Sequence, residues 1–263
     1  MEDIPRKAGF PVLTMKKHII ITALLACLAV PLFGQAPAAT SLSADEVMAR
    51  VFVWDNQREA LGGGYRGSRE YKFYNHRMDK RAEMVAAVFC DADGTKHFQV
   101  VSEDGWKSAN KHVLRKMLDS ESEASQPANR LKIRLIPDNY KFQMIRVESL
   151  EGRPSYVIEV TPKRSDKYLF SGRIWVDAED FALARAEGQP AKNPSFWTRS
   201  VHFVQQYHKS GAFWYPVETT SFTEAMIFDG TDVSIRYFDY SPISNSARSS
   251  ASPAPTEVKY VQH

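Results

Sequence analysis

The chain has 263 residues, of which 43% are hydrophobic and 25% charged, the composition of a globular protein with room for one large domain or two small ones. Its formal net charge of +3 is too small to indicate a nucleic-acid-binding protein, and no basic cluster is interleaved with aromatic residues. Aromatic residues make up 12% of the chain and are concentrated in its second half, which favours β structure there.

Residues 1–38 have the pattern of an N-terminal extension and a secretory signal peptide. Met15-Lys16-Lys17 forms a basic start, residues 19–33 are apolar, and Ala36-Pro37-Ala38 fits the small-residue cleavage signal. The apolar run is too short and too openly terminated to be a comfortable membrane span. We therefore expect export to the periplasm, with cleavage after Ala38 leaving 225 of the 263 residues.

The two cysteines bear on anchoring and on redox chemistry. The segment LLAC ending at Cys27 weakly resembles a lipid-attachment signal, so an outer-membrane lipoprotein is the alternative location. Against it, the apolar run continues to Phe33, where a lipoprotein would turn polar. Cys90 is the single cysteine of the mature chain, so no intramolecular disulfide can form, and its place at a strand end predicts a buried, inert thiol.

The mature chain begins with a helix. Ser43 and Glu46 form a capping box, and apolar residues then recur at helical spacing through Val47, Val51 and Trp54 to about residue 58. The triple glycine 62–64 lacks the lysine of a phosphate-binding loop and follows a helix rather than a strand. It predicts a plain connection between the helix and the first strand.

Strands 65–76, 84–90 and 97–101 follow, with a turn at 91–94 that lacks the later acidic ligands of a calcium loop. Residues 106–120 then read as a helix whose apolar stripe includes Val113 and Met117. Its basic flank could face an anionic membrane or head group, although such a flank is more often only solvated.

The rest of the chain alternates like a series of antiparallel strands. Residues 121–129 predict a polar linker, 188–194 an interruption, and 243–263 a flexible tail rich in Ser, Ala and Pro after a single domain spanning 39–242. We expect nine to eleven strands and two main helices, an α+β fold. The further strands are predicted at 131–136, 140–150, 156–161, 169–177, 181–187, 200–208, 213–223 and 233–240.

Charged residues divide these strands into two faces. With Glu159 placed outward, Ile158 and Val160 point the other way, and the same alternation continues through the later strands. Two helices cannot fully cover so wide an apolar face, so it is either packed into a half-barrel without a ligand or left partly open as a binding concavity. The residues predicted to line the cavity are Ile158, Val160, Ile174, Val176, Val201, Phe203, Val217, Ile235 and Tyr237.

The segments YVIEVTPK (156–163), GRIWVD (172–177), FWYP (213–216) and 233–240 mark strands rather than a reaction centre. With the order of helix, hairpin, second helix and long meander, they resemble the LolA/LolB-type periplasmic lipoprotein carriers, and more closely the outer-membrane lipoprotein-sorting-protein-like group. The resemblance covers residues 43–242.

The resemblance implies an incomplete, strongly curved antiparallel β-barrel with lid helices around an apolar cavity for acyl chains. It also implies an arginine that governs release, for which Arg66, Arg69 and Arg81 are unmatched candidates. The lid residues expected on the two helices are Val47, Val51, Trp54, Val113 and Met117.

No motif predicts an enzyme: the chain has no G-x-S-x-G elbow, no H-E-x-x-H and no zinc-ligand spacing of cysteines. His202 and His208 share a strand face but lie too far apart to bind one metal, so we expect exposed histidines. We expect no catalytic residue, no metal site and no cofactor.

The expected function is that of a monomeric periplasmic carrier that binds lipoprotein acyl chains or phospholipid and moves them toward the outer membrane. Inner-membrane donor and outer-membrane acceptor proteins would be its partners, and nucleic acid would not. The alternative is a non-catalytic envelope sensor or interaction module that binds a lipid or a protein.

Overall fold

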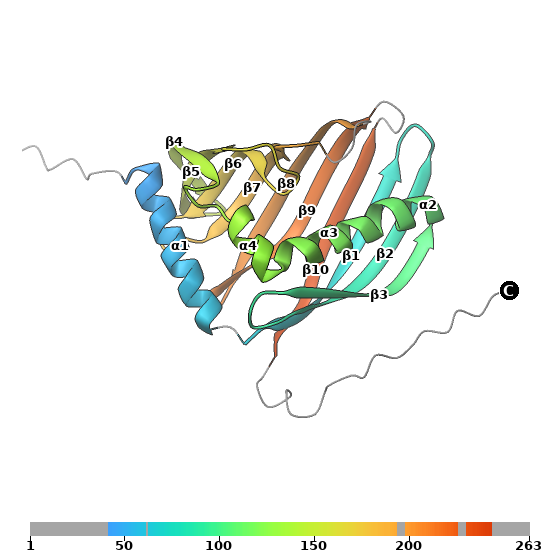
Figure 1. Ribbon diagram of the computed structural model, residues 1–263, viewed down its shortest axis with the longest axis horizontal. Coiled ribbons are helices and arrows are strands. Elements are labelled where there is room, and N and C mark those ends of the chain that lie inside the picture. The colour runs from blue at the N-terminus through green and yellow to red at the C-terminus, as the bar shows by residue number, and fades with distance from the viewer. Residues whose placement is uncertain (1–41, 62, 194–197, 226–229, 244–263) are drawn as a thin grey trace, which may run out of the picture. The chain divides into compact units, whose positions relative to one another are not determined.

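The computed structural model describes residues 42–61, 63–193, 198–225 and 230–243 (Figure 1). The predicted signal peptide, Cys27 and residues 244–263 of the predicted tail lie outside these ranges. Within the described ranges, no helix is both long enough and apolar enough to cross a lipid bilayer.

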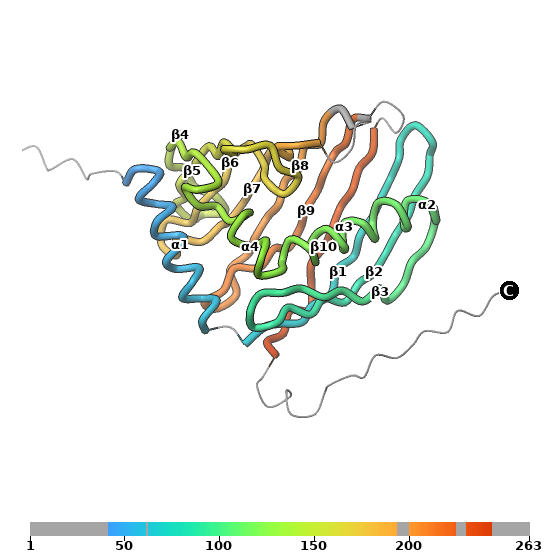
Figure 2. Tube along the Cα trace, in the orientation of Figure 1, coloured from blue at the N-terminus to red at the C-terminus, as the bar shows by residue number. Residues whose placement is uncertain are grey.

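Ten antiparallel strands form one curved sheet (Figures 1 and 2). Their order is β3-β2-β1-β10-β9-β8-β7-β6-β5-β4. Consecutive strands are neighbours except β3 and β4, which form the two edges, and β1 pairs with β10. Among the described residues β3 and β4 each have one neighbour, so the sheet is not closed. The strands are β1 (Tyr65–Asn75), β2 (Lys80–Cys90), β3 (Lys96–Gly105), β4 (Tyr140–Leu150), β5 (Arg153–Pro162), β6 (Phe170–Asp177), β7 (Leu183–Pro190), β8 (Thr198–Ser210), β9 (Phe213–Ala225) and β10 (Thr231–Pro242).

The helices cover one face of this sheet, here called the inner face (Figure 1). α1 precedes β1, and a second helical segment connects β3 to β4. The expected fold class, α+β with an open, curved antiparallel sheet and helices over it, is confirmed. The helical elements are α1 (Ala44–Leu61), α2 (Lys107–Ala109), a π-helical turn η1 (Asn110–Leu114), α3 (Arg115–Ser125) and α4 (Pro127–Ile133).

The start of α1 is fixed by the predicted capping box. The backbone N–H of Ser43 donates to Oε2 of Glu46 at 2.8 Å, and the backbone N–H of Glu46 donates to Oγ of Ser43 at 3.3 Å. These two bonds satisfy amide groups that no helical carbonyl can reach. The backbone N–H and the hydroxyl of Ser43 both donate to Oε2 of Glu46 and lower the pKa of this carboxyl, which favours the carboxylate at the positive end of the helix dipole.

Two predictions for residues 121–136 are wrong. The predicted polar linker is instead the end of α3 followed by α4. The first half of the predicted strand 131–136 is the end of α4, and the second half belongs to no helix or strand. Pro127 occupies the first turn of α4, where proline lacks no needed hydrogen bond and its fixed φ suits a helix. A six-residue alternating run is too short to separate a strand from a helical turn, so the proline was the better signal.

The interruption predicted at 188–194 is also misplaced, because β7 continues through Gly188 to Pro190. Gly188 lies opposite Gly172 in the β6–β7 pairing. A Cβ atom at Gly172 would come within 2.0 Å of the carbonyl oxygen of Glu187, so only glycine fits this close approach of two backbones. The glycines here join strands rather than end them.

Two separate hydrophobic cores lie between the helices and the sheet. The first, here called the α1 core, packs Val47, Met48 and Val51 of α1 against strands β4–β7. The second, here called the α3 core, packs Leu114 of η1 and Leu118 of α3 against strands β1, β2 and β10. The two helical segments thus cover different strands on the same inner face of the sheet.

Candidate functional site

Four of the nine predicted cavity residues lie in the α1 core. Ile158, Val160, Ile174 and Val176 have no exposed surface, because α1 packs directly on them. The lid residues Val47 and Val51 are the side chains that cover them, at 0% and 5% exposure. This part of the inner face is filled by protein, and contact of these residues with a ligand stays a prediction.

The β10 residues of the predicted cavity lie in the α3 core. Ile235 and Tyr237 are 6% and 8% exposed. The lid residues Val113 and Met117 are half-buried against the same core. The second helical segment therefore covers the inner face of β1, β2 and β10, as α1 covers the inner face of β4–β7.

Trp54 is not on the covering face of α1, contrary to the lid prediction. Its side chain is 45% exposed, with Val53 at 51% and Leu61 at 75%. The buried residues of α1 all come from its first half, Ala44 to Val51. Beyond that point Asp55 and Arg58 pair with each other at 2.7 Å, and Arg58 also donates to the carbonyl oxygens of Asp180 and Phe181, so polar contacts replace apolar packing.

Strands β8 and β9 occupy the middle of the sheet, yet no described side chain of either is fully buried. The β8–β9 pairing places Gln205 opposite Thr219 and Phe203 opposite Ser221, and the β9–β10 pairing places Thr219 opposite Ile235. These side chains therefore share the inner face. The register places the half-buried Val201, Phe203, Gln205, Thr219, Ser221 and Thr223 on this face. Together with Val217, which the alternation from Thr219 adds at an irregularity of the β8–β9 pairing, they are here called the central strip.

The central strip is more polar than the sequence pattern predicted. Amide and hydroxyl groups stand beside Val201 and Phe203 on this face, and contact of Val201, Phe203 and Val217 with a ligand stays a prediction. Phe203 meets the ring of Phe170 edge-on with 5.3 Å between centroids, which joins the strip to the edge of the α1 core. The strip is thus a mixed surface between two apolar cores.

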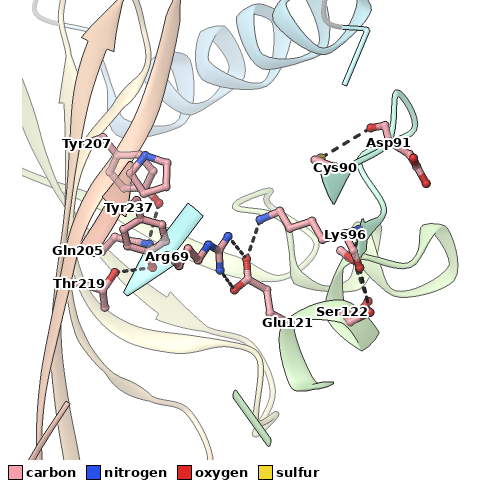
Figure 3. A network of polar contacts seen from close by, with 12 residues as sticks. Arg69, Cys90, Asp91, Lys96, Glu121, Ser122, Gln205, Tyr207, Thr219 and Tyr237 are labelled. Carbon is pink, nitrogen blue, oxygen red and sulfur yellow. Dashed lines mark hydrogen bonds and ion pairs between the residues drawn. The ribbon is translucent and has the colours of Figure 1, made fainter. Parts of the chain in front are cut away.

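A partly buried ion cluster ties the second helical segment to the sheet (Figure 3). Arg69 of β1 holds Glu121 of α3 through two bonds, Nη1 to Oε2 at 2.5 Å and Nη2 to Oε1 at 3.0 Å. Lys96 of β3 also donates to Oε1 of Glu121, at 2.8 Å. The Arg69 side chain is only 1% exposed and lies between the rings of Phe98 and Tyr237, 5.0 and 4.8 Å from their centroids.

The charges of this cluster depend on one another. Burial alone would raise the pKa of Glu121, but attraction to Lys96 and Arg69 outweighs it and holds that pKa well below its usual range. Burial would lower the pKa of Lys96, and the Glu121 carboxylate raises it instead. Nε of Arg69 has no hydrogen-bond partner among the described residues, so this guanidinium depends on its bidentate pair.

Glu121 was missed because residues 121–129 were predicted to be a linker. The structure continues α3 through it, and the inward positions Leu114, Leu118, Glu121 and Ser125 follow at spacings of four, three and four. That spacing is the usual apolar stripe of a helix. A carboxylate in the apolar stripe of a helix is a signal that could have indicated a buried cation opposite. Arg69 is one of the three arginines that the sequence offered as candidates for governing release.

Hydrogen bonds connect the ion cluster to the central strip (Figure 3). The hydroxyl of Tyr207 donates to Oε1 of Gln205 at 2.8 Å, and Nε2 of Gln205 donates to the hydroxyl of Tyr237 at 3.4 Å. That same hydroxyl lies 2.9 Å from Oγ1 of Thr219. Since the ring of Tyr237 contacts Arg69, one continuous set of contacts runs from β8 to the ion cluster.

The histidines and the cysteine singled out in the sequence form no catalytic group with one another in the described part of the chain. His202 and His208 are exposed as expected, and His208 lies 3.4 Å from Glu151. Cys90 is buried and unpaired, and burial raises the pKa of its thiol. The described residues contain no group of three or more His, Cys, Asp or Glu side chains that could hold a metal ion.

Comparison with known proteins matches residues 138–244 to a family of unknown function, DUF5686. This stretch runs from the start of β4 to just past β10 and is less than half of the chain. No curated protein sequence matches the chain.

Several solved structures are similar to the chain. A LolA superfamily protein from Nitrosomonas europaea is 11% identical, with a TM-score of 0.39 over 78% of this chain and 95% of that one. A putative outer membrane lipoprotein-sorting protein domain from Vibrio parahaemolyticus is 12% identical, with a TM-score of 0.39 over 76% and 94%. The MucA/MucB complex of Pseudomonas aeruginosa matches at 10% identity and a TM-score of 0.27 over 76% and 99%. These similarities agree with the resemblance found in the sequence, and at these values they carry no argument about ligand or partner.

Proposed function

We propose that the chain is a non-catalytic binding protein of the bacterial cell envelope that takes up acyl chains of a lipid or lipoprotein on the central strip and moves them toward the outer membrane. One observation carries this proposal. The two middle strands of a ten-stranded sheet contribute no fully buried side chain among the described residues, while strands on either side are packed under helices. A half-covered inner face between two packed cores is suited to a ligand.

The chemistry of the strip suits an amphiphile. Val201, Phe203 and Val217 offer apolar surface, and burial of an acyl chain contributes about 0.8 kcal/mol per methylene group. Gln205 and Thr219 offer an amide and a hydroxyl at the same level of the sheet. These groups can hydrogen-bond the ester or amide through which an acyl chain is attached, so the linkage would not be left unsatisfied.

The Arg69–Glu121–Lys96 cluster supports a gating role for the second helical segment. It fixes α3 beside the strip through contacts that depend on charge. Loss of the pair would leave the 1% exposed Arg69 without its partner. The arrangement with α3 held against β1 would therefore be strongly preferred until a competing anion or a partner protein replaces Glu121. Arg69 is therefore our choice among the three candidate lid arginines.

The test is native mass spectrometry with lipid extraction on the mature chain purified from periplasm without detergent, followed by titration with a fluorescent fatty acid. We expect a bound phospholipid or acylated peptide, and saturable uptake of the probe. Val217→Gln on the strip should weaken uptake, and Val101→Gln, at a 65% exposed position of β3, should not.

A clean mass without lipid, together with no probe uptake, would contradict the carrier proposal. That outcome would favour the alternative, an envelope sensor or interaction module that binds a protein partner. Equal weakening by Val217→Gln and Val101→Gln would instead show that the probe binds elsewhere.

A further inference from the structure

A hollow lies on the outer face of the sheet, away from the helices. It is a groove of about 610 Å³, formed by one end of β1, β2, β8, β9 and β10. Its side chains alternate with those of the α3 core: Tyr74 follows the buried Phe73, and Asp232 precedes the buried Val233. The groove therefore lies on the opposite face of the sheet from the central strip, although Ser221 of the strip is also among its lining residues. Its volume falls in the range of about 300–1,000 Å³ that small-ligand sites have.

The strand register arranges the groove into rows that cross the strands. Arg81 of β2 lies opposite Tyr74 of β1, and Tyr74 lies opposite Asp232 of β10. Asp232 lies opposite Phe222 of β9, and Phe222 opposite His202 of β8. The adjacent row has Glu83, Lys72, Ser234, Thr220 and Val204.

Phe222 offers the apolar surface of this groove. Its side chain is 44% exposed, and it lines both this groove and a neighbouring hollow of about 580 Å³ that also includes His76, Arg77 and Glu224. The other ring, Tyr74, is already contacted by the Arg81 guanidinium at 5.1 Å and by the His76 ring at 4.5 Å. A ligand longer than one small ring can therefore pass over Phe222 from one hollow into the next.

The groove carries charges of both signs, which favours an uncharged ligand over a strongly ionic one. Arg81 and Lys72 are balanced by Glu83 and Asp232, so donors and acceptors are present in similar measure. The floor consists of interior strands and contains neither edge strand of the sheet, β3 or β4, to which a peptide strand could be added. Recognition in the groove must come from side chains.

We propose that this outer groove binds a short, uncharged oligosaccharide. The C–H face of one sugar ring would stack on Phe222, because an aromatic face attracts the positively polarised hydrogens of such a ring. The sugar hydroxyls, which both donate and accept, would bond to Asp232, His202 and Arg81 in the row beside it. This site is independent of the acyl-binding proposal and lies on the opposite face of the sheet.

The test is titration calorimetry of the mature chain with three soluble probes: chitotetraose, maltotetraose and xylotetraose. We expect at least one to bind with a dissociation constant below about 1 mM, and Phe222→Ala to weaken it by about tenfold, the effect of losing one stacking contact. Phe89→Ala is the matched control, since Phe89 is a 39% exposed phenylalanine at the far end of β2 and should leave binding unchanged.

Absence of binding by all three probes would overturn the proposal, and so would equal affinity of Phe222→Ala and the unmodified chain. Two measurements separate a failure of this proposal from a failure of the acyl-binding proposal, because each variant is tested with the other site's ligand. Val217→Gln should retain oligosaccharide binding, and Phe222→Ala should retain uptake of the fluorescent fatty acid.

Discussion

The α1 core and the α3 core hold their helices over the same sheet by different forces. In the α1 core, Val47, Met48 and Val51 pack among apolar side chains and tyrosine and phenylalanine rings. In the α3 core, the same kind of packing by Leu114 and Leu118 is supplemented by the partly buried Arg69–Glu121–Lys96 cluster. Apolar packing is non-directional and insensitive to pH, whereas a buried ion pair requires its geometry and charge. The two helical segments are therefore expected to respond to different perturbations.

The largest expected effect comes from removing Glu121. Glu121→Ala leaves the almost fully buried Arg69 without its carboxylate, and breaking one side of a buried pair costs about 3–5 kcal/mol. Because Glu121 itself is one-third exposed, we expect the lower end of that range. Urea denaturation followed by circular dichroism measures the loss.

The double variant Arg69→Met with Glu121→Leu sharpens this test. Replacing both charges by apolar groups removes the desolvation cost along with the attraction, so the double variant should be more stable than Glu121→Ala. If the double variant lost as much stability as Arg69→Met and Glu121→Leu lose together when measured singly, the cluster would contribute through something other than its pairing.

The apolar core should respond to lost volume. Ile158→Ala removes buried methyl groups beneath α1, and such a change costs about 2–5 kcal/mol depending on how far the site collapses. Ile145→Ala at a 41% exposed position of β4 is the control and should change stability by less than about 0.5 kcal/mol. Similar losses at both positions would contradict the packed α1 core.

Sequence patterns predicted most of the sheet because its strands alternate with period two. β4 has the predicted bounds 140–150, and the strands after it agree within a few residues apart from the extension of β7 through Gly188. The α1 cap was likewise readable, since a capping box is a local signal of two residues. What periodicity predicts well is which face of an element is apolar.

Periodicity could not predict what each apolar position would meet. Ile158 and Phe203 both point to the inner face, but one is sealed under α1 and the other is half-buried between the two cores. The difference comes from where the helices settle on the sheet, a tertiary outcome with no local signal. The pairing of Arg69 with Glu121 joins residues 52 positions apart, which no spacing rule relates.

Acid should weaken the α3 core selectively. The pKa of Glu121 in the folded protein lies below the ordinary value of 4.5 that it has in the unfolded chain. Its contribution is therefore fully present above about pH 4.5 and is lost as the pH falls from there toward the lower folded pKa. The stability difference between the unmodified chain and Glu121→Gln should be constant between pH 6 and 7 and shrink below about pH 4.

Comparing these two chains cancels the acid sensitivity of the other carboxylates, among them Asp177 beside Arg153. A gap that stays constant down to pH 3 would contradict the assignment of a paired, low-pKa carboxylate to Glu121. Ile158→Ala offers a further check, because its stability difference from the unmodified chain should not vary with pH.

The smallest expected effect is at Trp54, where the helical spacing predicted a covering residue and the structure leaves a side chain 45% exposed. Trp54→Gln should change the free energy of unfolding by about 0.5 kcal/mol or less, since the indole is already half in solvent. Val51→Gln, three residues earlier and 5% exposed, should cost about 2 kcal/mol or more because it buries an amide among apolar groups. Chemical denaturation of the two variants compares neighbouring turns of one helix. Equal losses of stability in the two variants would mean that the indole is covered in solution. That result would contradict the exposure of this face of α1, which the α1 core does not cover.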